Sequence, residues 1–303
     1  MGDYWLCGWR VRSEIALPEL APWTGADQDP DLVIRMGVVP LRLEGGVDVG
    51  PFHQIDSRGA GLVQLEDIGA FHVTGPGEVV VSPAPGAAEV ELRLILLGSV
   101  LGVICHLRGL FPLHASCVSI DGKAVAFCGA SGAGKSTTAL HLTLRGHGLL
   151  SDDVTLIDAT GNGPPQVWPA FPRLKLWQDS LESARIERDG LERNRPGQSK
   201  YHYRASEAFH PGPVPLAAIF LLSKAGPGET DGIKRLSSPM DIIPALDAEV
   251  FRPGVGRALG RTGSLLAAQA AITSAVPVYR LTRRFDLAAT GGWLQAVETS
   301  LRS

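Results

Sequence analysis

Residues 129–136 read Gly129-Ala130-Ser131-Gly132-Ala133-Gly134-Lys135-Ser136, and this stretch decides the fold. It satisfies the GxxxxGK[ST] pattern of a phosphate-binding loop (P-loop) at every specified position. Its glycines let successive backbone N–H groups converge on phosphates, and the helix that follows adds the positive end of its dipole. We therefore expect residues Gly129 to Thr137 to bind a nucleotide, with Lys135 reaching its β- and γ-phosphates and Ser136 binding Mg²⁺.

The sequence around the P-loop has the context that this chemistry needs. An apolar strand, Ala124–Cys128, precedes the loop, and a helix, Thr137–Arg145, follows it. Upstream, Leu113–Ile120 is joined to that strand by Asp121-Gly122, a two-residue turn signal that predicts a hairpin of two antiparallel strands. The pattern predicts an α/β fold.

Two adjacent carboxylates, Asp152 and Asp153, lie inside the apolar run Leu149–Asp158. Burying two like charges is costly unless a cation compensates them, and beside a P-loop Mg²⁺ is the obvious cation. Consecutive strand residues point to opposite faces, but a kink at the strand end would direct both to the phosphates. One carboxylate would then hold the metal, and the other would take the proton of an attacking hydroxyl group. His114 begins the hairpin, so its side chain is expected near the γ-phosphate.

Composition excludes several classes of protein. The chain has 303 residues, with 28 Lys and Arg against 31 Asp and Glu, a formal net charge of −3. A protein that neutralises nucleic-acid phosphates needs a basic excess, so we expect no nucleic-acid partner. The four cysteines lie far apart without CxxC spacing, which indicates reduced thiols and neither a zinc site nor disulfides.

No segment predicts a secretory signal or a membrane span. Met1 is followed by Gly2-Asp3-Tyr4-Trp5 without a basic region before an apolar stretch. The longest apolar run, Leu94–Cys105, is shorter than the roughly 18 to 20 residues that a membrane span needs. We therefore expect a cytoplasmic protein that does not enter a membrane.

Two domains are expected. Up to residue 88, short apolar segments such as Leu32–Met36 and Glu78–Val81 are broken by Gly and Pro, which predicts a strand-rich N-terminal domain, 1–88. From Ala87 to Arg108 a run without Pro predicts a buried helix, and we assign 89–303 to the domain that carries the P-loop. Further along, helices are predicted at Leu176–Leu191, Pro239–Leu246 and Gly263–Ala275, and strands at Ala217–Leu222 and Pro277–Leu281.

Residues 112–158 resemble the catalytic core of HPr kinase/phosphorylase, a bacterial protein serine kinase with a P-loop fold related to phosphoenolpyruvate carboxykinase. The resemblance is carried by His114, by GASGAGKST from Gly129 to Thr137, and by RGHGLLSDDVTLID from Arg145 to Asp158. It implies a P-loop kinase domain of this type, ATP and Mg²⁺ as cofactors, and a peptide or protein substrate that bears an acceptor serine. It also implies that the chain can form a homo-oligomer.

The resemblance implies a role for each matched position. Lys135 matches the P-loop lysine and Ser136 the Mg²⁺ ligand. Asp152 matches the carboxylate proposed as catalytic base, and Asp153 matches its metal-binding neighbour. His114 matches a histidine beside the reacting phosphate.

The sequence departs from this family in two places. The Glu-Ile-Arg-Gly-type segment of HPr kinases is not found, and the stretch nearest to it is Phe171–Trp177. The opening WLCGWRVRS, Trp5–Ser13, with Leu17–Leu20, is similar to shorter HPr-kinase-like proteins found with lasso peptide biosynthesis genes, which phosphorylate a serine at the carboxyl end of the precursor peptide. We therefore prefer a lasso precursor peptide over HPr as the substrate.

Basic residues downstream are candidates for binding the substrate. Lys200 and Arg204 lie in and beside the predicted loop 197–203, and a lid over phosphates should be mobile and basic. Arg173 is a further candidate, since a guanidinium suits phosphate and carboxylate groups, and Lys175 belongs to the same set of basic residues.

Three other functions stay open at the level of sequence. One is an HPr-type protein serine kinase, and another is a small-molecule kinase or carboxykinase-like enzyme. The third is a nucleotide-binding sensor or assembly factor without phosphotransfer, although such a protein has less need of the Asp152-Asp153 pair.

Overall fold

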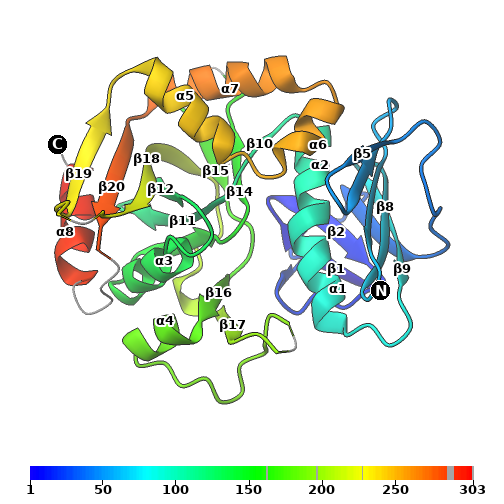
Figure 1. Cartoon of the computed structure of the whole chain (residues 1–303). Coiled ribbons are helices and arrows are strands. Elements are labelled where there is room, and N and C mark those ends of the chain that lie inside the picture. The colour runs from blue at the N-terminus through cyan, green and yellow to red at the C-terminus, as the bar shows by residue number, and fades with distance from the viewer. Residues whose placement is uncertain (162, 196, 227, 285–289, 302–303) are drawn as a thin grey trace. The chain divides into compact units, whose positions relative to one another are not determined.

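The computed structural model describes residues 1–161, 163–195, 197–226, 228–284 and 290–301 (Figure 1). The chain divides into two compact units. The first unit comprises Met1–Pro112 and Phe251–Ala267, and the second comprises Leu113–Val250 and Ala268–Ser303. This division differs from the expected boundary after residue 88, because the apolar helix that follows residue 88 packs on a strand of the first unit.

The first unit is built on a nine-stranded sheet with the order β3-β1-β2-β4-β9-β8-β7-β6-β5. Strands β2, β4 and β9 run parallel, and the remaining neighbours run antiparallel. The strands are β1 (Gly2–Leu6), β2 (Trp9–Ser13), β3 (Ala21–Pro22), β4 (Leu32–Met36), β5 (Val47–Val49), β6 (His53–Ile55), β7 (Gly61–Leu65), β8 (Gly69–Gly75) and β9 (Glu78–Pro83). The predicted richness in strands is confirmed.

A long buried helix follows this sheet, as predicted. It consists of α1 (Glu89–Ile95), a π-helical turn η1 (Leu96–Val100) and α2 (Leu101–Leu107). Within the described residues it is the one helix that is long and apolar enough to cross a membrane, but 83% of its most apolar window is buried inside the protein. The apolar run Leu94–Cys105, which was expected to be too short to span a membrane, is thus part of a longer helix. This helix is as buried as the core helix of a globular unit. The unit also contains α6 (Pro253–Ala258).

The second unit contains the P-loop and a mixed sheet. Strands β13, β11, β12, β18, β20 and β19 are neighbours in that order, and β12, β18 and β20 run parallel. Its strands are β11 (Ala115–Ile120), β12 (Lys123–Cys128), β13 (Gly148–Ser151), β14 (Thr155–Asp158), β15 (Gln166–Trp168), β16 (Arg173–Trp177), β17 (Lys200–Arg204), β18 (Val214–Lys224), β19 (Gly232–Leu236) and β20 (Val278–Arg283). Its helices are α3 (Lys135–Leu144), α4 (Gln178–Ser183), the 3₁₀ turn η2 (Ser206–Ala208), α5 (Pro239–Ala248) and α8 (Thr290–Ser300). The chain passes between the units three times: within β10 (Phe111–Leu113), between Val250 and Phe251, and within α7 (Thr262–Ala275).

The register of this sheet brings three chemistry-bearing segments to one edge. Ala115, the first residue of β11, pairs with Cys128, the last residue of β12. Cys117 of β11 pairs with Ser151, the last residue of β13. His114, the P-loop and the two aspartates therefore leave the sheet side by side.

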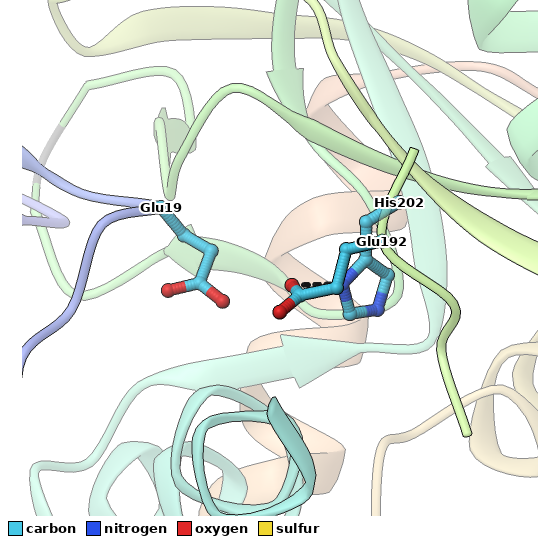
Figure 2. Close-up of side chains that lie close together, drawn as sticks. All are labelled: Glu19, Glu192 and His202. Carbon is cyan, nitrogen blue, oxygen red and sulfur yellow. Dashed lines mark hydrogen bonds and ion pairs between the residues drawn. The ribbon is translucent and has the colours of Figure 1, made fainter. Parts of the chain in front are cut away.

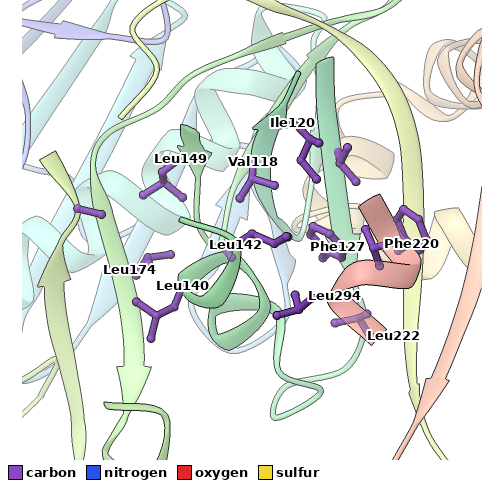
Figure 3. Packing of buried hydrophobic residues seen from close by; sticks show 14 of the residues in the cluster. Val118, Ile120, Phe127, Leu140, Leu142, Leu149, Leu174, Phe220, Leu222 and Leu294 are labelled. Carbon is purple, nitrogen blue, oxygen red and sulfur yellow. The ribbon is translucent and has the colours of Figure 1, made fainter. Parts of the chain in front are cut away.

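An apolar core fixes this edge to helix α3 (Figure 3). The side chains come from the sheet, from α3, from α8 and from β16, which lie far apart in the sequence. The labelled members are Val118, Ile120, Phe127, Leu140, Leu142, Leu149, Leu174, Phe220, Leu222 and Leu294. Phe127 and Phe220 stack with their ring centroids 5.5 Å apart. Because interiors are packed at crystal-like density, the start of α3 is held at a fixed position relative to the sheet.

Two predictions of secondary structure between residues 176 and 204 are wrong. The predicted helix Leu176–Leu191 is reduced to α4, and the predicted lid loop 197–203 is largely strand β17, which pairs antiparallel with β16. The reason is a period of two: Leu174 and Leu176 of β16 and Tyr201 of β17 are buried in the core, while the residues between them face the other way. Lys200 and Arg204 therefore lie on a strand.

Candidate active site

The P-loop, residues Gly129–Ser136, has the backbone that its glycines were expected to provide. Gly129, Gly132 and Gly134 have φ values of 144°, 84° and 86°. A Cβ atom at Gly129 would lie 2.9 Å from the carbonyl oxygen of Leu222, so this position excludes a side chain on space as well as on φ. Helix α3 begins at Lys135, directly after the loop.

Lys135 points back into the P-loop. Its Nζ atom donates hydrogen bonds to the carbonyl oxygens of Gly129 (2.6 Å) and Ala130 (3.4 Å). Burial lowers the pKa of Lys135, while Glu249, Asp152 and Asp153 act in the opposite direction. The ammonium group thus lies against the backbone of the P-loop.

Asp152 is buried, with 4% of its surface exposed, and both of its oxygens are engaged. Oδ1 accepts hydrogen bonds from Ser116 Oγ (2.6 Å) and Ser136 Oγ (2.8 Å). Oδ2 accepts a hydrogen bond from the backbone N–H of Lys175 (2.8 Å). The structure therefore joins Asp152 directly to the P-loop serine.

Asp153 follows with a positive φ of 76°, which is rare for a residue with a side chain and produces the kink expected at the strand end. Its Oδ2 atom accepts a hydrogen bond from Lys175 Nζ (2.7 Å), and its Oδ1 atom lies 3.6 Å from His114 Nδ1. Burial alone would raise the pKa of Asp153, but the charge and the hydrogen bond of the Lys175 ammonium group outweigh burial and hold the pKa well below its usual range. Asp153 is therefore ionised at neutral pH.

His114 is held beside Asp153. Its Nδ1 atom donates a hydrogen bond to the carbonyl oxygen of Asp153 (3.0 Å). Burial lowers the pKa of His114, although Asp153 favours the charged ring, so the ring is neutral at pH 7. Glu249 contributes from a distant part of the chain, because its carbonyl oxygen accepts the backbone N–H of His114 (2.7 Å).

These groups line one cavity of about 500 Å³ in the second unit. From the predicted set, the lining includes His114, Ser131, Gly132, Gly134, Lys135, Ser136, Thr137, Asp152, Asp153 and Lys200. Lys175, Trp177, Asp179 and Ser180 complete it. Gly129, Ala130 and Ala133 belong to the same loop, but they are not among the residues that line the cavity.

Of the three predicted substrate-binding residues, one lines the cavity and two do not. Lys200 lines the cavity, with its Nζ atom 5.6 Å from the ring centroid of Trp177, which is its cross-strand neighbour. Arg173 is buried with its guanidinium 4.9 Å from the ring centroid of Phe171, and Arg204 is exposed and donates a hydrogen bond to Ser206. Arg173 and Arg204 are cross-strand neighbours of each other, outside the residues that line the cavity.

The donor atoms at the P-loop fit a Mg²⁺ ion. Mg²⁺ prefers oxygen ligands and usually takes one or two carboxylates together with phosphates and water. Ser136 Oγ and Asp152 Oδ1 lie 2.8 Å apart at the start of α3, and the ionised Asp153 lines the same cavity. Ser136 and Asp152 would hold the ion, which would neutralise charge on the phosphates of a nucleotide.

Several residues of the site were given no role by the sequence analysis. Ser116 and Glu249 bind Asp152 and the P-loop, respectively, with Glu249 Oε2 accepting the backbone N–H of Gly129 (3.1 Å). Trp177 lines the cavity, and Lys175, considered only as one of several basic residues, binds both aspartates. The period of two in Arg173–Trp177 could have placed Lys175 and Trp177 on one strand face, whereas a lone serine or glutamate carries no local signal.

Strand β17 is further tied to the loop before it by His202 (Figure 2). The His202 ring lies opposite Lys175 in the register, and its Nδ1 atom is 3.3 Å from Glu192 Oε2. Its Nε2 atom is 3.2 Å from Asn194 Oδ1. These contacts hold β17, and with it Lys200, at the cavity.

Curated relatives of the chain are HPr kinase/phosphorylases. The chain is 51% identical to the one from Exiguobacterium sibiricum over 51 residues, which are 17% of this chain and 16% of that protein. It is 35% identical to the one from Bordetella pertussis over 82 residues, which are 27% of this chain and 25% of that protein. The fold is HPr kinase-like.

The likeness to HPr kinases is concentrated in a small part of the molecule. The matched segments span about a quarter or less of the curated relatives. No protein-family model matches the chain. Among solved structures, the HPr(Ser) kinase/phosphatase from Coxiella burnetii aligns with 63% of this chain and 88% of its own, with a TM-score of 0.33 and 15% identity.

Proposed function

We propose that this protein is an ATP- and Mg²⁺-dependent kinase that transfers the γ-phosphoryl group of ATP to a serine hydroxyl group of a peptide or protein. One observation carries the proposal. The Ser136–Asp152 pair and the Asp153–His114–Lys175 cluster line the same cavity at the P-loop. A protein that only binds a nucleotide needs the Ser136–Asp152 pair for its metal ion. Phosphoryl transfer to an alcohol also needs a carboxylate that accepts the proton of the hydroxyl group, which the second cluster contains.

The geometry favours exchanging the two roles that the family resemblance implies for the aspartates. In P-loop enzymes the metal is held by the loop serine or threonine and by an aspartate on a neighbouring strand. Asp152 meets this requirement through its 2.8 Å contact with Ser136. Asp153 is more exposed, at 29% of its side chain, and faces the cavity. We therefore assign metal binding to Ser136 and Asp152, and proton transfer to Asp153.

The transfer step follows from these positions. The serine oxygen of the acceptor forms a bond to the γ-phosphorus, the bond from that phosphorus to the β–γ bridging oxygen breaks, and ADP leaves. The serine proton passes to Asp153, which His114 and Lys175 hold in place. Lys135 and the backbone amides of the P-loop stabilise charge on the phosphates. A bound Mg²⁺ ion supplies further charge neutralisation.

For the acceptor we propose the serine at the carboxyl end of a lasso precursor peptide. The similarity of Trp5–Ser13 and Leu17–Leu20 to the kinases of that pathway supports it, and so does Lys200. In the described part of the chain no carboxylate lies within 4.0 Å of Lys200 Nζ, so this ammonium group can receive the terminal carboxylate of a peptide. We also propose a cytoplasmic location, as expected from the sequence, and a homo-oligomeric assembly, by analogy with HPr kinases.

Mass spectrometry of a precursor peptide that ends in serine, after incubation with the protein, ATP and Mg²⁺, tests the proposal. A phosphoryl transfer adds about 80 Da, and the gain should vanish when the terminal serine is replaced by alanine or when the enzyme carries Lys135→Ala. HPr and other serine-bearing peptides serve as alternative acceptors. Unchanged peptide with every acceptor, together with measurable ATP binding, would reject the kinase in favour of a nucleotide-binding sensor.

A further inference from the structure

Arg283 reaches the P-loop from β20, which lies two strands away from β12 in the same sheet. It is the last residue of β20, which runs parallel to β18, as β18 does to β12, so its side chain emerges at the edge where the P-loop begins. Only 6% of its surface is exposed. Its Nη2 atom donates hydrogen bonds to the carbonyl oxygens of Ala133 (2.9 Å) and Gly134 (3.3 Å) and to Thr138 Oγ1 (3.1 Å).

These two carbonyl groups control the direction of two amides. In a planar trans peptide the C=O group of one residue and the N–H group of the next point in opposite directions. Holding the carbonyl oxygens of Ala133 and Gly134 therefore turns the N–H groups of Gly134 and Lys135 away from Arg283. Gly134 and Lys135 both line the cavity, and these are the amides with which a P-loop cradles phosphates.

The same guanidinium is fixed from behind by the C-terminal helix. Its carbon atom lies 4.1 Å from the ring centroid of Trp293 on α8, a distance at which a cation is attracted to the face of the ring. In the described ranges no carboxylate lies within 4.0 Å of Arg283, and burial lowers its pKa to about 10, so it remains charged at pH 7. A buried cation without a close anion is costly to maintain, which argues that the P-loop needs it.

We propose that Arg283 is a positioning residue for the P-loop, which aims the amides of Gly134 and Lys135 at the phosphates of the bound nucleotide. The inference rests on the proposed nucleotide site. It adds to that site a residue that lies outside the P-loop, at the end of β20. This residue acts on the affinity for the phosphate groups of the nucleotide and not on the affinity for its nucleoside part.

Titration calorimetry of ATP with Mg²⁺ against Arg283→Gln, Arg283→Lys and the wild-type protein tests the inference. We expect Arg283→Gln to weaken ATP binding by about tenfold or more, since hydrogen bonds from a charged group are lost. A lysine ammonium group is not planar and cannot stack on the Trp293 ring, which holds the donor nitrogen in place, so Arg283→Lys should lose most of the same affinity. The affinity for adenosine should change less than twofold in both variants. General damage to the fold would weaken the binding of ATP and of adenosine alike.

Arg284→Gln is the matched control. Arg284 is the next residue, its side chain is 72% exposed, and its substitution changes the net charge by the same amount. It should bind ATP like the wild-type protein. If wild-type protein does not bind ATP, the proposed function fails. If it does, and Arg283→Lys binds ATP within twofold of it, the positioning role is rejected, whether or not Arg283→Gln folds.

Discussion

At the scale of single residues, the two neighbouring aspartates differ in what they touch. Asp152 is closed in by Ser116, Ser136 and the backbone of Lys175. Asp153 has a salt bridge to Lys175 Nζ and a side open to the cavity. The positive φ of Asp153 breaks the strand between them, and in the proposed function this lets the two residues divide metal binding and proton transfer.

This division predicts different kinetic defects for the two aspartates. Asp152→Asn should raise the Mg²⁺ concentration for half-maximal activity by about tenfold or more, since a charged ligand of the ion is lost. Asp153→Asn should lower kcat by about a hundredfold or more with an unchanged Mg²⁺ requirement, since general-base contributions are of this size. Initial rates over a range of Mg²⁺ concentrations separate the two effects. The reverse pattern would restore the roles that the resemblance implies.

At the scale of elements, local turn chemistry explains which parts were predictable. The Asp121-Gly122 turn and the glycines of the P-loop demand positive φ values, and both segments adopt them. The ribbon β16–β17 was missed, because the apolar residues after Leu176 also suit a helix and only the partner strand settles the choice. Glu249 and Arg283 could not be predicted, since they reach the P-loop from 120 and about 150 positions away.

The hairpin turn gives a prediction about stability. Gly122→Ala should lower the free energy of unfolding by about 1 kcal/mol, the cost of a Cβ atom at positive φ. Among the described residues, no atom outside the neighbouring residues of the chain lies within 4 Å of the added Cβ, so the cost is one of backbone conformation. Urea denaturation measures it, with Lys123→Ala at the neighbouring exposed position as the control. Kinetic constants should not change, because the turn lies at the opposite end of the hairpin from the P-loop.

At the scale of the whole molecule, each of the two units is made of two separate stretches of the chain, so the division cannot be seen in the order of the sequence. Residues Phe251–Ala267 return to the first unit after the second unit has begun. Local composition predicts a boundary where a Pro- and Gly-rich segment interrupts the pattern, as at residues 83–86. A later segment joins the unit that contains its packing partners, as α6 does by packing against α2. The local sequence does not indicate these partners.

Buried histidines of the first unit make the stability of the protein depend on pH. Burial, assisted by the charge of Arg252, lowers the pKa of His53 from 6.5 to about 4, and burial also lowers the pKa of His106. Below pH 6.5 the unfolded chain binds a proton that folded His53 does not accept until about pH 4. The free energy of unfolding should therefore fall by up to about 3 kcal/mol between pH 6.5 and pH 4 on account of His53.

Urea denaturation at a series of pH values, for the wild-type protein and for His53→Leu, measures this contribution. In the described part of the chain His53 Nε2 is buried without a hydrogen-bond partner, so leucine removes a titrating group without breaking a contact at that atom. The variant should lose stability less steeply than the wild-type protein from pH 6.5 to pH 4, with His106 keeping part of the slope. Since the His53 contribution is fully present above pH 6.5, parallel curves over that window would show that the His53 ring takes up its proton equally well in the folded and unfolded chain.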